Sequence, residues 1–429
     1  MRGQRDLHAL ARQLGIEVRW RDQDGVTHMC SDETLLASLW MLGVALQRPE
    51  DARAERRRLD HERAARLLEP VTVAWNGEPP VLTVRLPNAE HEEPFEIVVE
   101  HGAHAERILR DECELRATSP LDGAVQLDVK LPRGFPTGRH RITLQCGSRR
   151  AQATLLAAPA RIGRAGLQRA WGVFAPVYAL HDRDRTHTGD LSSFARLAAW
   201  TSARGGRVVA TLPILSTFVG HGGEPVDASP YAPVSRRFWN EVYLDLAALP
   251  EREGELPVVE PSPGRFVDLP RLAAARRPAL ERALGRLEAD PDRRGALDAW
   301  LASMPLALEY ARFRAHLEGS GEHGARLHAY VQWSMAQQLG TLGHEAAGRD
   351  QVLYFDLPIG AHREGFDVVH EGELFVRDAS VGAPPDDFFA GGQDWGFPPV
   401  HPHIARETGY AYFASCLEAH FRYARALRL

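Results

Sequence analysis

The spacing of hydrophobic positions predicts that the chain begins with helices. Apolar residues recur every three or four positions over residues 5–46, which is the period of an amphipathic helix. Ser31 followed by Thr34 is typical of a helix N-terminus, and it predicts a second helix over Leu35 to Leu46. A charged helix with a thin apolar stripe is expected from Arg53 to Leu68. We therefore assign residues 1–68 to a helical N-terminal segment.

From Val71 onward the hydrophobic period becomes two. Alternating runs contain Val71, Val81, Phe95, Val125 and Arg141, and Asn-Gly and Pro-Pro turn signals follow the first of them. Short strands at this spacing, broken by glycine and proline, are typical of a β-sandwich. We assign residues 69–160 to such a domain and interpret residues 159–169 as a linker.

A third pattern starts at Trp171. Nearly continuous apolar runs over residues 172–180, 208–215 and 352–359 are separated by helical patterns, of which residues 190–203 are one. Such runs are typical of parallel strands buried on both faces, so the fold class of residues 161–429 is predicted to be α/β. The arginine-rich helical stretch at about 268–347 is interpreted as an insertion, and a helix over 410–426 leads into a fourth strand.

Composition excludes several classes of protein. The formal net charge of −6 argues against nucleic acid as a partner, and no run approaches the ~20 apolar residues of a membrane span. The start of the chain has no apolar core of signal-peptide length, and the four cysteines form no C-x-x-C pair. We expect a cytoplasmic protein with reduced thiols.

Histidines raise the alternative of a metal site. His401 and His403 are one candidate pair, and His181 and His187 are another. No acid or cysteine accompanies them at the spacing of a closed zinc set, so we interpret these histidines as structural or exposed and expect no metal.

Three polar and aromatic motifs follow the predicted strands, where the active sites of α/β barrels gather. The first contains Ser229 and Tyr231; an amphipathic aromatic ring beside a hydroxyl suits a pyranose, which has one apolar face and a rim of hydroxyl groups. Its alternative is a turn-rich loop with a buried tyrosine. The second contains Glu364, which could equally be an exposed loop acid.

The third motif is the densest. Its first part is the loop Gly382, Ala383, Pro384, Pro385 and Asp386, and its second part is Gly392, Gln393, Asp394, Trp395 and Gly396. A long Gly- and Pro-rich segment that carries a tryptophan is typical of a lid beside a binding site. Arg428, near the end of the chain, is either a further ligand-binding group or a strand-end charge.

In this order the motifs resemble the 4-α-glucanotransferases (amylomaltase or disproportionating enzyme, glycoside hydrolase family 77) of the long bacterial type. The resemblance implies N-terminal domains followed by the first half of a (β/α)₈ TIM barrel. It also implies retaining transfer of α-1,4-glucan segments between maltooligosaccharides, without a cofactor. Three positions depart from the family pattern: Glu241 stands in place of proline, Phe355 in place of glycine and Val369 in place of tryptophan.

The resemblance also implies the roles of single residues. It makes six residues contacts of the sugar: Ser229, Tyr231, Glu364, Gln393, Trp395 and Arg428. It makes the loop with Gly382, Pro384, Pro385 and Asp386 a lid over the glucan. The family's catalytic carboxylates follow the strand that contains Arg428 and would lie beyond Leu429, so we expect no catalytic residue here and no transferase activity of this chain alone. The alternatives are a maltooligosaccharide-binding pseudoenzyme, or one half of a split enzyme whose partner is the C-terminal barrel half.

Overall fold

The structure is a computed structural model of the 429-residue chain. It describes residues 2–22, 24–88, 92–121, 124–163, 167, 169–181, 188–257 and 266–429. The chain divides into two compact units, each of which is described by itself. The first unit contains residues 1–163, 382–394 and 400–411, and the second contains residues 164–381, 395–399 and 412–429.

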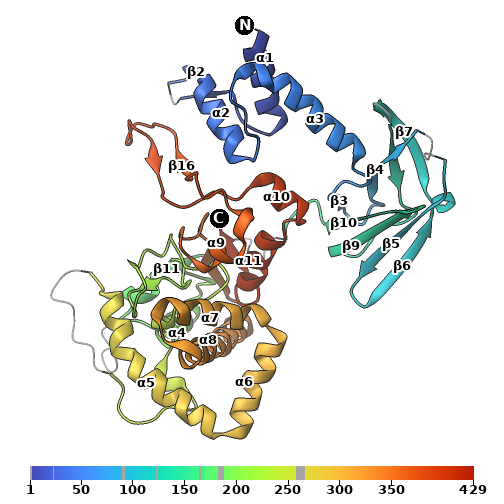
Figure 1. Cartoon of the computed structure of the whole chain (residues 1–429). Helices are drawn as coiled ribbons and strands as arrows, with labels where there is room; N and C mark the ends of the chain where they lie inside the picture. Colours follow the sequence, from blue (N-terminus) through green and yellow to red (C-terminus); the bar gives the residue numbers. More distant parts are fainter. Residues whose placement is uncertain are drawn as a thin grey trace. The chain divides into compact units, whose positions relative to one another are not determined.

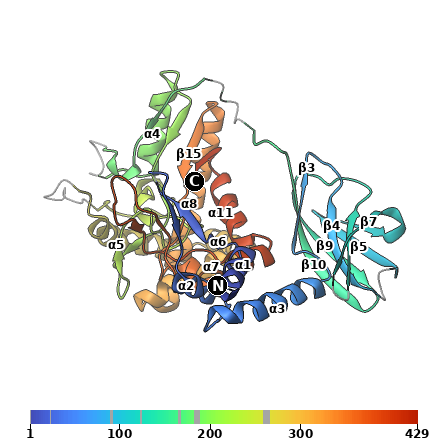
Figure 2. The same cartoon turned by 90° about the horizontal axis from the view of Figure 1, so that it is seen from above.

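The first unit begins with three helices and a short hairpin, which together enclose a small apolar core (Figure 1). Ser31 caps α2, because its hydroxyl accepts a hydrogen bond from the Thr34 amide at 3.1 Å. The helix α3 extends from this core to the first strands of the sandwich in both views (Figures 1 and 2). The elements are α1 (Arg2–Gln13), β1 (Arg19–Arg21), β2 (Thr27–Met29), α2 (Asp32–Met41) and α3 (Ala52–Ala65).

Two sheets follow and enclose the main core of the first unit. One has the strand order β3-β10-β9-β5-β6 and the other the order β4-β8-β7. All pairs are antiparallel except β10 with β3. The strands are β3 (Val71–Trp75), β4 (Val81–Pro87), β5 (Phe95–His101), β6 (His104–Leu109), β7 (Glu114–Leu121), β8 (Ala124–Lys130), β9 (Gly138–Cys146) and β10 (Arg149–Ala158).

Two segments from late in the chain complete the first unit. A two-stranded hairpin pairs β16 (Gly382–Ala383) with β17 (Gln393–Asp394). The short helix α10 (Pro402–Glu407) lies against the sandwich, where Arg406 forms an ion pair with Glu69 at 2.9 Å.

The second unit is built on a four-stranded parallel sheet. Its strands follow chain order as β11-β12-β15-β18. They are β11 (Gly172–Phe174), β12 (Val208–Ala210), β15 (Val352–Asp356) and β18 (Ala426–Arg428). Between them lie α4 (Leu191–Ser202), the hairpin of β13 (Phe218–Val219) and β14 (Val226–Asp227), α9 (Phe366–His370) and α11 (Ala411–Phe421).

Four consecutive helices between β14 and β15 form the largest helical part of this unit (Figure 1). They are α5 (Leu269–Ala289), α6 (Pro291–Ser303), α7 (Pro305–Glu318) and α8 (Gly321–Gly348). The long helix α8 packs against the other three helices and also against α4 and β15. Short 3₁₀ turns occur at residues 49–51, 110–112, 177–179, 241–243, 246–248 and 372–374.

Several predicted elements need correction. Residues 5–46 are not continuously helical, because the β1–β2 hairpin lies between α1 and α2. The apolar runs from residues 172 and 208 contain only three strand residues each, since Pro176 and Pro213 follow closely and proline cannot donate to a ladder. The alternation used to locate the sandwich missed β6, β7 and β10.

The helices in the described part of the chain are all too short or too polar to cross a membrane.

Candidate functional site

Three polar side chains meet at the C-terminal ends of the parallel strands. Asp356 ends β15 and pairs in register with Arg428 of β18, while Tyr231 comes from the loop after β14. The Tyr231 hydroxyl donates to Oδ2 of Asp356 at 3.0 Å, and Nη2 of Arg428 donates to the Tyr231 oxygen at 2.6 Å. Arg428 also forms an ion pair with the same Asp356 oxygen. The three residues therefore form a closed hydrogen-bonded cluster.

The charges of this cluster fix its protonation at neutral pH. Burial and the hydrogen bond to Asp356 raise the pKa of Tyr231 above its usual value of 10, so the phenol stays neutral and can donate. The hydrogen bond to Asp356 likewise raises the pKa of Arg428. Nearly half of the Arg428 side chain is exposed, and a guanidinium has five N–H donors in total, which leaves donors for a ligand.

The loop that carries Tyr231 is held by its own polar side chains. Asp227 Oδ1 accepts from the Ser229 amide at 3.0 Å, and Ser229 Oγ accepts from the Tyr231 amide at 3.3 Å. These are the local turns that Asp and Ser side chains form with the following backbone.

The part of this loop that follows Tyr231 is anchored by a buried carboxylate from another element, Asp367 in α9. Its carboxylate accepts from Ser235 Oγ at 2.7 Å, from the Arg236 amide at 2.7 Å and from Tyr412 at 2.8 Å. It also forms an ion pair with Arg237 at 3.0 Å. A buried carboxylate is stable only when it is paired in this way, so the loop after Tyr231 has one defined path.

Beside the cluster lies a cavity of about 400 Å³ with a largely apolar wall. Its lining residues are Ser229, Tyr231, Ala232, Ile359, Trp395 and Phe397. The Trp395 and Phe397 rings are neighbours with a centroid separation of 6.2 Å. We call this cavity the strand-end pocket. Its volume is within the usual range of about 300–1,000 Å³ for small-molecule sites.

Phe397 reaches this position because Gly360 leaves room for it. A Cβ atom at residue 360 would lie 2.0 Å from Cδ2 of Phe397. The backbone on either side of Trp395 is fixed as well, since the Trp395 amide donates to the Val381 carbonyl at 2.9 Å and the Val381 amide donates to the Phe397 carbonyl at 2.9 Å.

The structure thus brings together four of the six expected sugar contacts. Ser229, Tyr231 and Trp395 line the strand-end pocket, and Arg428 binds Tyr231. Glu364 does not line it: this residue is exposed, and its amide donates to His362 Nδ1 at 3.1 Å. Gln393 is half-buried in β17 of the first unit.

The expected lid belongs to the first unit, as the β16–β17 hairpin. Gly382 lies in β16, and Pro384 and Pro385 follow it. Asp386 Oδ1 accepts from the amides of Phe388 at 2.9 Å and Phe389 at 2.7 Å, which forms a tight turn at the tip of the hairpin.

Sequence reasoning did not assign sugar contacts to Asp356, Ile359 or Phe397. Each lies within or directly beside a recognised motif, and Asp356 ends an apolar run, where a polar residue reaches the site edge of a parallel sheet. That position was the available signal.

Glu241, which departs from the family pattern, belongs to a second buried polar cluster. His221 Nε2 lies 3.3 Å and His328 Nδ1 3.7 Å from the Glu241 carboxylate. His328 Nε2 lies 2.8 Å from Glu318, which Arg277 also pairs at 2.8 Å. Burial opposes ionisation of Glu318, but the hydrogen bonds from His328 and Arg277 overcome it and lower its pKa to about 2. The cluster joins the 3₁₀ turn at 241–243 to α5, α7 and α8.

The described residues contain no group of three His, Cys, Asp or Glu side chains placed to hold a metal ion. His401 Nδ1 instead accepts from the Ile404 amide at 3.4 Å and caps α10. His187, named above with His181, lies outside the described residues.

Two family profiles match the chain. The profile described as 4-alpha-glucanotransferase, glycoside hydrolase family 77, matches residues 175–326 and 316–429. The profile described as the MalQ N-terminal beta sandwich domain matches residues 67–159, which confirms the predicted sandwich.

Individual relatives agree with the profiles. A 4-alpha-glucanotransferase of Mycobacterium tuberculosis is 30% identical over 478 aligned residues, covering 98% of this chain and 64% of the relative. One from Haemophilus influenzae is 26% identical over 317 residues, covering 61% of this chain and 45% of the relative.

Two solved structures resemble the fold. The amylomaltase from Corynebacterium glutamicum has a TM-score of 0.82 and 25% identity, covering 99% of this chain and 64% of that one. The amylomaltase from Streptococcus agalactiae in complex with acarbose has a TM-score of 0.52 and 20% identity, covering 61% and 59%. The chain spans 64% of the length of the mycobacterial and corynebacterial relatives. These matches confirm the α/β fold, and the chain belongs to glycoside hydrolase family 77, the 4-α-glucanotransferases.

Proposed function

We propose that a polypeptide containing these residues transfers α-1,4-glucan segments between maltooligosaccharides with retention of configuration. The observation that carries the proposal is the Tyr231–Asp356–Arg428 cluster beside an aromatic pocket, at the C-terminal ends of parallel strands, in a member of family 77.

The chemistry of the strand-end pocket supports a pyranose ligand. Trp395, Phe397 and Ile359 offer an apolar wall for the C–H face of a sugar ring. The Ser229 hydroxyl and the free donors of Arg428 suit the hydroxyl rim. The Streptococcus agalactiae relative was solved with acarbose, which agrees with a ligand of this class.

The proposal divides binding from bond cleavage. Retaining transfer needs two carboxyl groups about 5–5.5 Å apart, one as nucleophile and one as acid and then base. Among the described residues, those that line the strand-end pocket include no acid. We therefore assign substrate binding to these residues, and the chemical steps to carboxylates outside this pocket lining.

We further propose the architecture in which these residues act. The sheet β11-β12-β15-β18 is the first half of a (β/α)₈ barrel in residues 161–429, with an insertion at about 268–347. A helical segment at residues 1–68 and a β-sandwich at 69–160 precede it. Glu364, Gln393 and the hairpin with Gly382 and Asp386 act as further sugar contacts and as a lid, which excludes water and so favours a sugar acceptor.

The test uses maltotriose. The chain, joined to the C-terminal half of a family 77 relative, is expected to convert maltotriose into glucose and longer maltooligosaccharides. The same fusion with Tyr231→Ala is expected to be slower by about tenfold or more. A folded fusion that yields no longer sugars would contradict the proposal.

A second candidate is binding without turnover by the 429-residue chain on its own. It is favoured by the lining of the strand-end pocket, which has aromatic and hydroxyl groups but no acid among the described residues. Maltoheptaose that binds the chain and is recovered unchanged would support this candidate; disproportionation by the chain alone would rule it out.

A further inference from the structure

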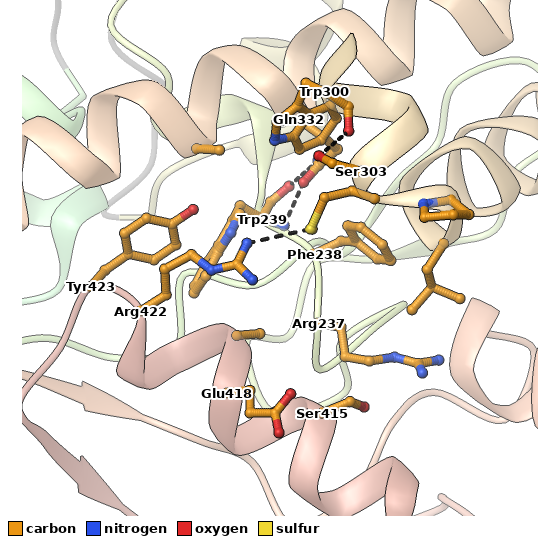
Figure 3. Close-up of a pocket in the computed structure, with 15 residues that line it drawn as sticks. Arg237, Phe238, Trp239, Trp300, Ser303, Gln332, Ser415, Glu418, Arg422 and Tyr423 are labelled. Atoms are coloured by element: carbon orange, nitrogen blue, oxygen red, sulfur yellow. Dashed lines mark hydrogen bonds between the residues drawn. The ribbon is translucent and has the colours of Figure 1, made fainter. Parts of the chain in front are cut away.

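A second cavity in the second unit is not explained by the proposed transfer reaction. Its volume is about 260 Å³, and it lies between α6, the start of α7, α8, α11 and the loop at residues 237–239 (Figure 3). We call it the helix pocket. None of its lining residues lines the strand-end pocket.

The floor of the helix pocket is a rigid tryptophan. Trp239 is buried, and its backbone is clamped by one side chain: its amide donates to Gln332 Oε1 at 3.0 Å and its carbonyl accepts from Gln332 Nε2 at 2.7 Å. The Tyr423 ring meets the Trp239 ring edge-on, with 5.7 Å between centroids. The aromatic floor is therefore formed before any ligand arrives.

The rim of the pocket is polar and aromatic. Ser415 and Glu418 lie three residues apart on α11 and so share one face of it, and Arg422 directly follows this helix; all three border the cavity (Figure 3). Trp300, half-buried, and Ser303 border it from α6. A ligand would thus meet aromatic surface and hydrogen-bonding groups at the same time.

The charges at the rim favour a neutral ligand. Arg237 also lines the cavity, but it is already paired with Asp367 at 3.0 Å and Glu371 at 2.7 Å. The remaining ionic groups are Glu418 and Arg422, which are opposite in sign and four residues apart. An anion or a cation would meet one unfavourable partner, whereas a polyol can accept from Arg422 and donate to Glu418.

We propose that the helix pocket is a second saccharide site, which holds one or two glucosyl units of an α-1,4-glucan. Its volume lies just below the range of about 300–1,000 Å³ typical of small-molecule sites, which suits a short stretch of sugar and not a long chain. The choice of glucan as the sugar rests on the proposed function; the pocket itself is independent of Tyr231. Binding at such a small site is expected to be weak, with a Kd of about 1 mM.

The test is a maltotetraose titration of the full chain, followed by NMR of indole N–H signals. Wild type is expected to show two independent sites per chain. Trp300→Ala and Glu418→Gln should each weaken the site reported by Trp239 by about tenfold and leave the site reported by Trp395 unchanged. Trp200→Ala, which removes an exposed tryptophan from α4, is the control and should change neither.

The outcomes separate the two proposals. Loss of the Trp395 response in Tyr231→Ala, with the Trp239 response retained, supports two sites. If neither Trp300→Ala nor Glu418→Gln changes binding, or if the Trp239 signal never responds to sugar, the helix pocket is not a saccharide site, whatever happens at the strand-end pocket. If only the Trp300-sensitive site binds, the inference stands and the proposed function fails. Because Glu418 is exposed, Glu418→Gln keeps the test valid should Trp300→Ala unfold.

Discussion

At the scale of single residues, Tyr231 joins the strand-end pocket to the ion pair of Asp356 and Arg428. Its hydroxyl is both donor to Asp356 and acceptor from Arg428. A hydroxyl used twice in this way fixes the position of the ring.

Tyr231→Phe is expected to keep the ring and lose both hydrogen bonds. Each such bond contributes about 0.5–1.5 kcal/mol, so glucan binding should weaken by several-fold, while Tyr231→Ala, which also removes the aromatic surface, should weaken it by more than tenfold. Calorimetric titration with maltoheptaose measures both. Tyr410→Phe, at a tyrosine of comparable exposure in the first unit, is the control; equal effects of the two phenylalanine variants would contradict the role of Tyr231.

Glu318 gives a prediction about pH. Its pKa is lowered from 4.5 to about 2 in the folded chain, so its stabilising contribution is complete above the unfolded value of 4.5 and is lost as the pH falls toward 2. Glu318→Gln should cost about 3 kcal/mol at neutral pH, because it removes the buried carboxylate that pairs with both His328 and Arg277, and should flatten the acid side of the stability curve.

Urea unfolding between pH 3 and pH 7 measures this difference. The control is Glu322→Gln, since Glu322 is exposed on α8. His221 acts in the opposite direction: the hydrogen bond to Glu241 raises its pKa, so its contribution is complete below 6.5 and is lost as rising pH passes the raised value. Parallel curves of stability against pH for wild type and Glu318→Gln would contradict the lowered pKa of Glu318.

At the scale of elements, the hydrophobic pattern of the sequence predicts many of the strands but misses others. Period-two alternation located β3, β4, β5, β8 and β9, but β10 escaped notice because Ala153 and Ala157 fill its core positions and alanine has little preference for strands. The short strands β11 and β12 were overestimated, because the segments that follow them are as apolar as the strands themselves.

The residues of the candidate site also divide into those that the sequence predicts and those that it does not. Motif residues on one loop, such as Ser229 and Tyr231, could be assigned from the sequence. Contacts between loops could not: the pairing of Tyr231 with Asp356 spans 125 positions, and the burial of Glu241 depends on histidines from two other segments. An apparent departure from the family pattern was therefore part of a compensated ionic cluster.

Gly360→Ala tests the packing of Phe397, which forms part of the wall of the strand-end pocket. The added Cβ would overlap the Phe397 ring, so the ring must move, with a cost of about 1–3 kcal/mol and a weaker glucan site. Gly391→Ala is the control, because no heavy atom lies within 4 Å of a Cβ built there and its φ is not positive. Thermal unfolding and glucan titration together measure the effect. An unchanged titration for Gly360→Ala would show that Phe397 does not contribute to the glucan site.

At the scale of the whole molecule, the division into two units predicts two unfolding steps. The sandwich has its own core, so a shortened chain ending at Ala158 should unfold cooperatively with a β signal in circular dichroism. It should be less stable than the same unit in the full chain, since it lacks ion pairs such as Arg66 with Glu407 and Glu69 with Arg406. A broad, non-cooperative transition would contradict its independence.

The strand-end pocket is proposed to bind α-1,4-glucan. The most direct measurement is the indole N–H signal of Trp395 in the full chain during titration with maltoheptaose, compared with the same titration of Tyr231→Ala. We predict a saturable shift of the Trp395 signal in the wild type that is lost or weakened by more than about tenfold in the variant. A folded wild-type chain whose Trp395 signal stays unchanged at saturating maltoheptaose would contradict the account.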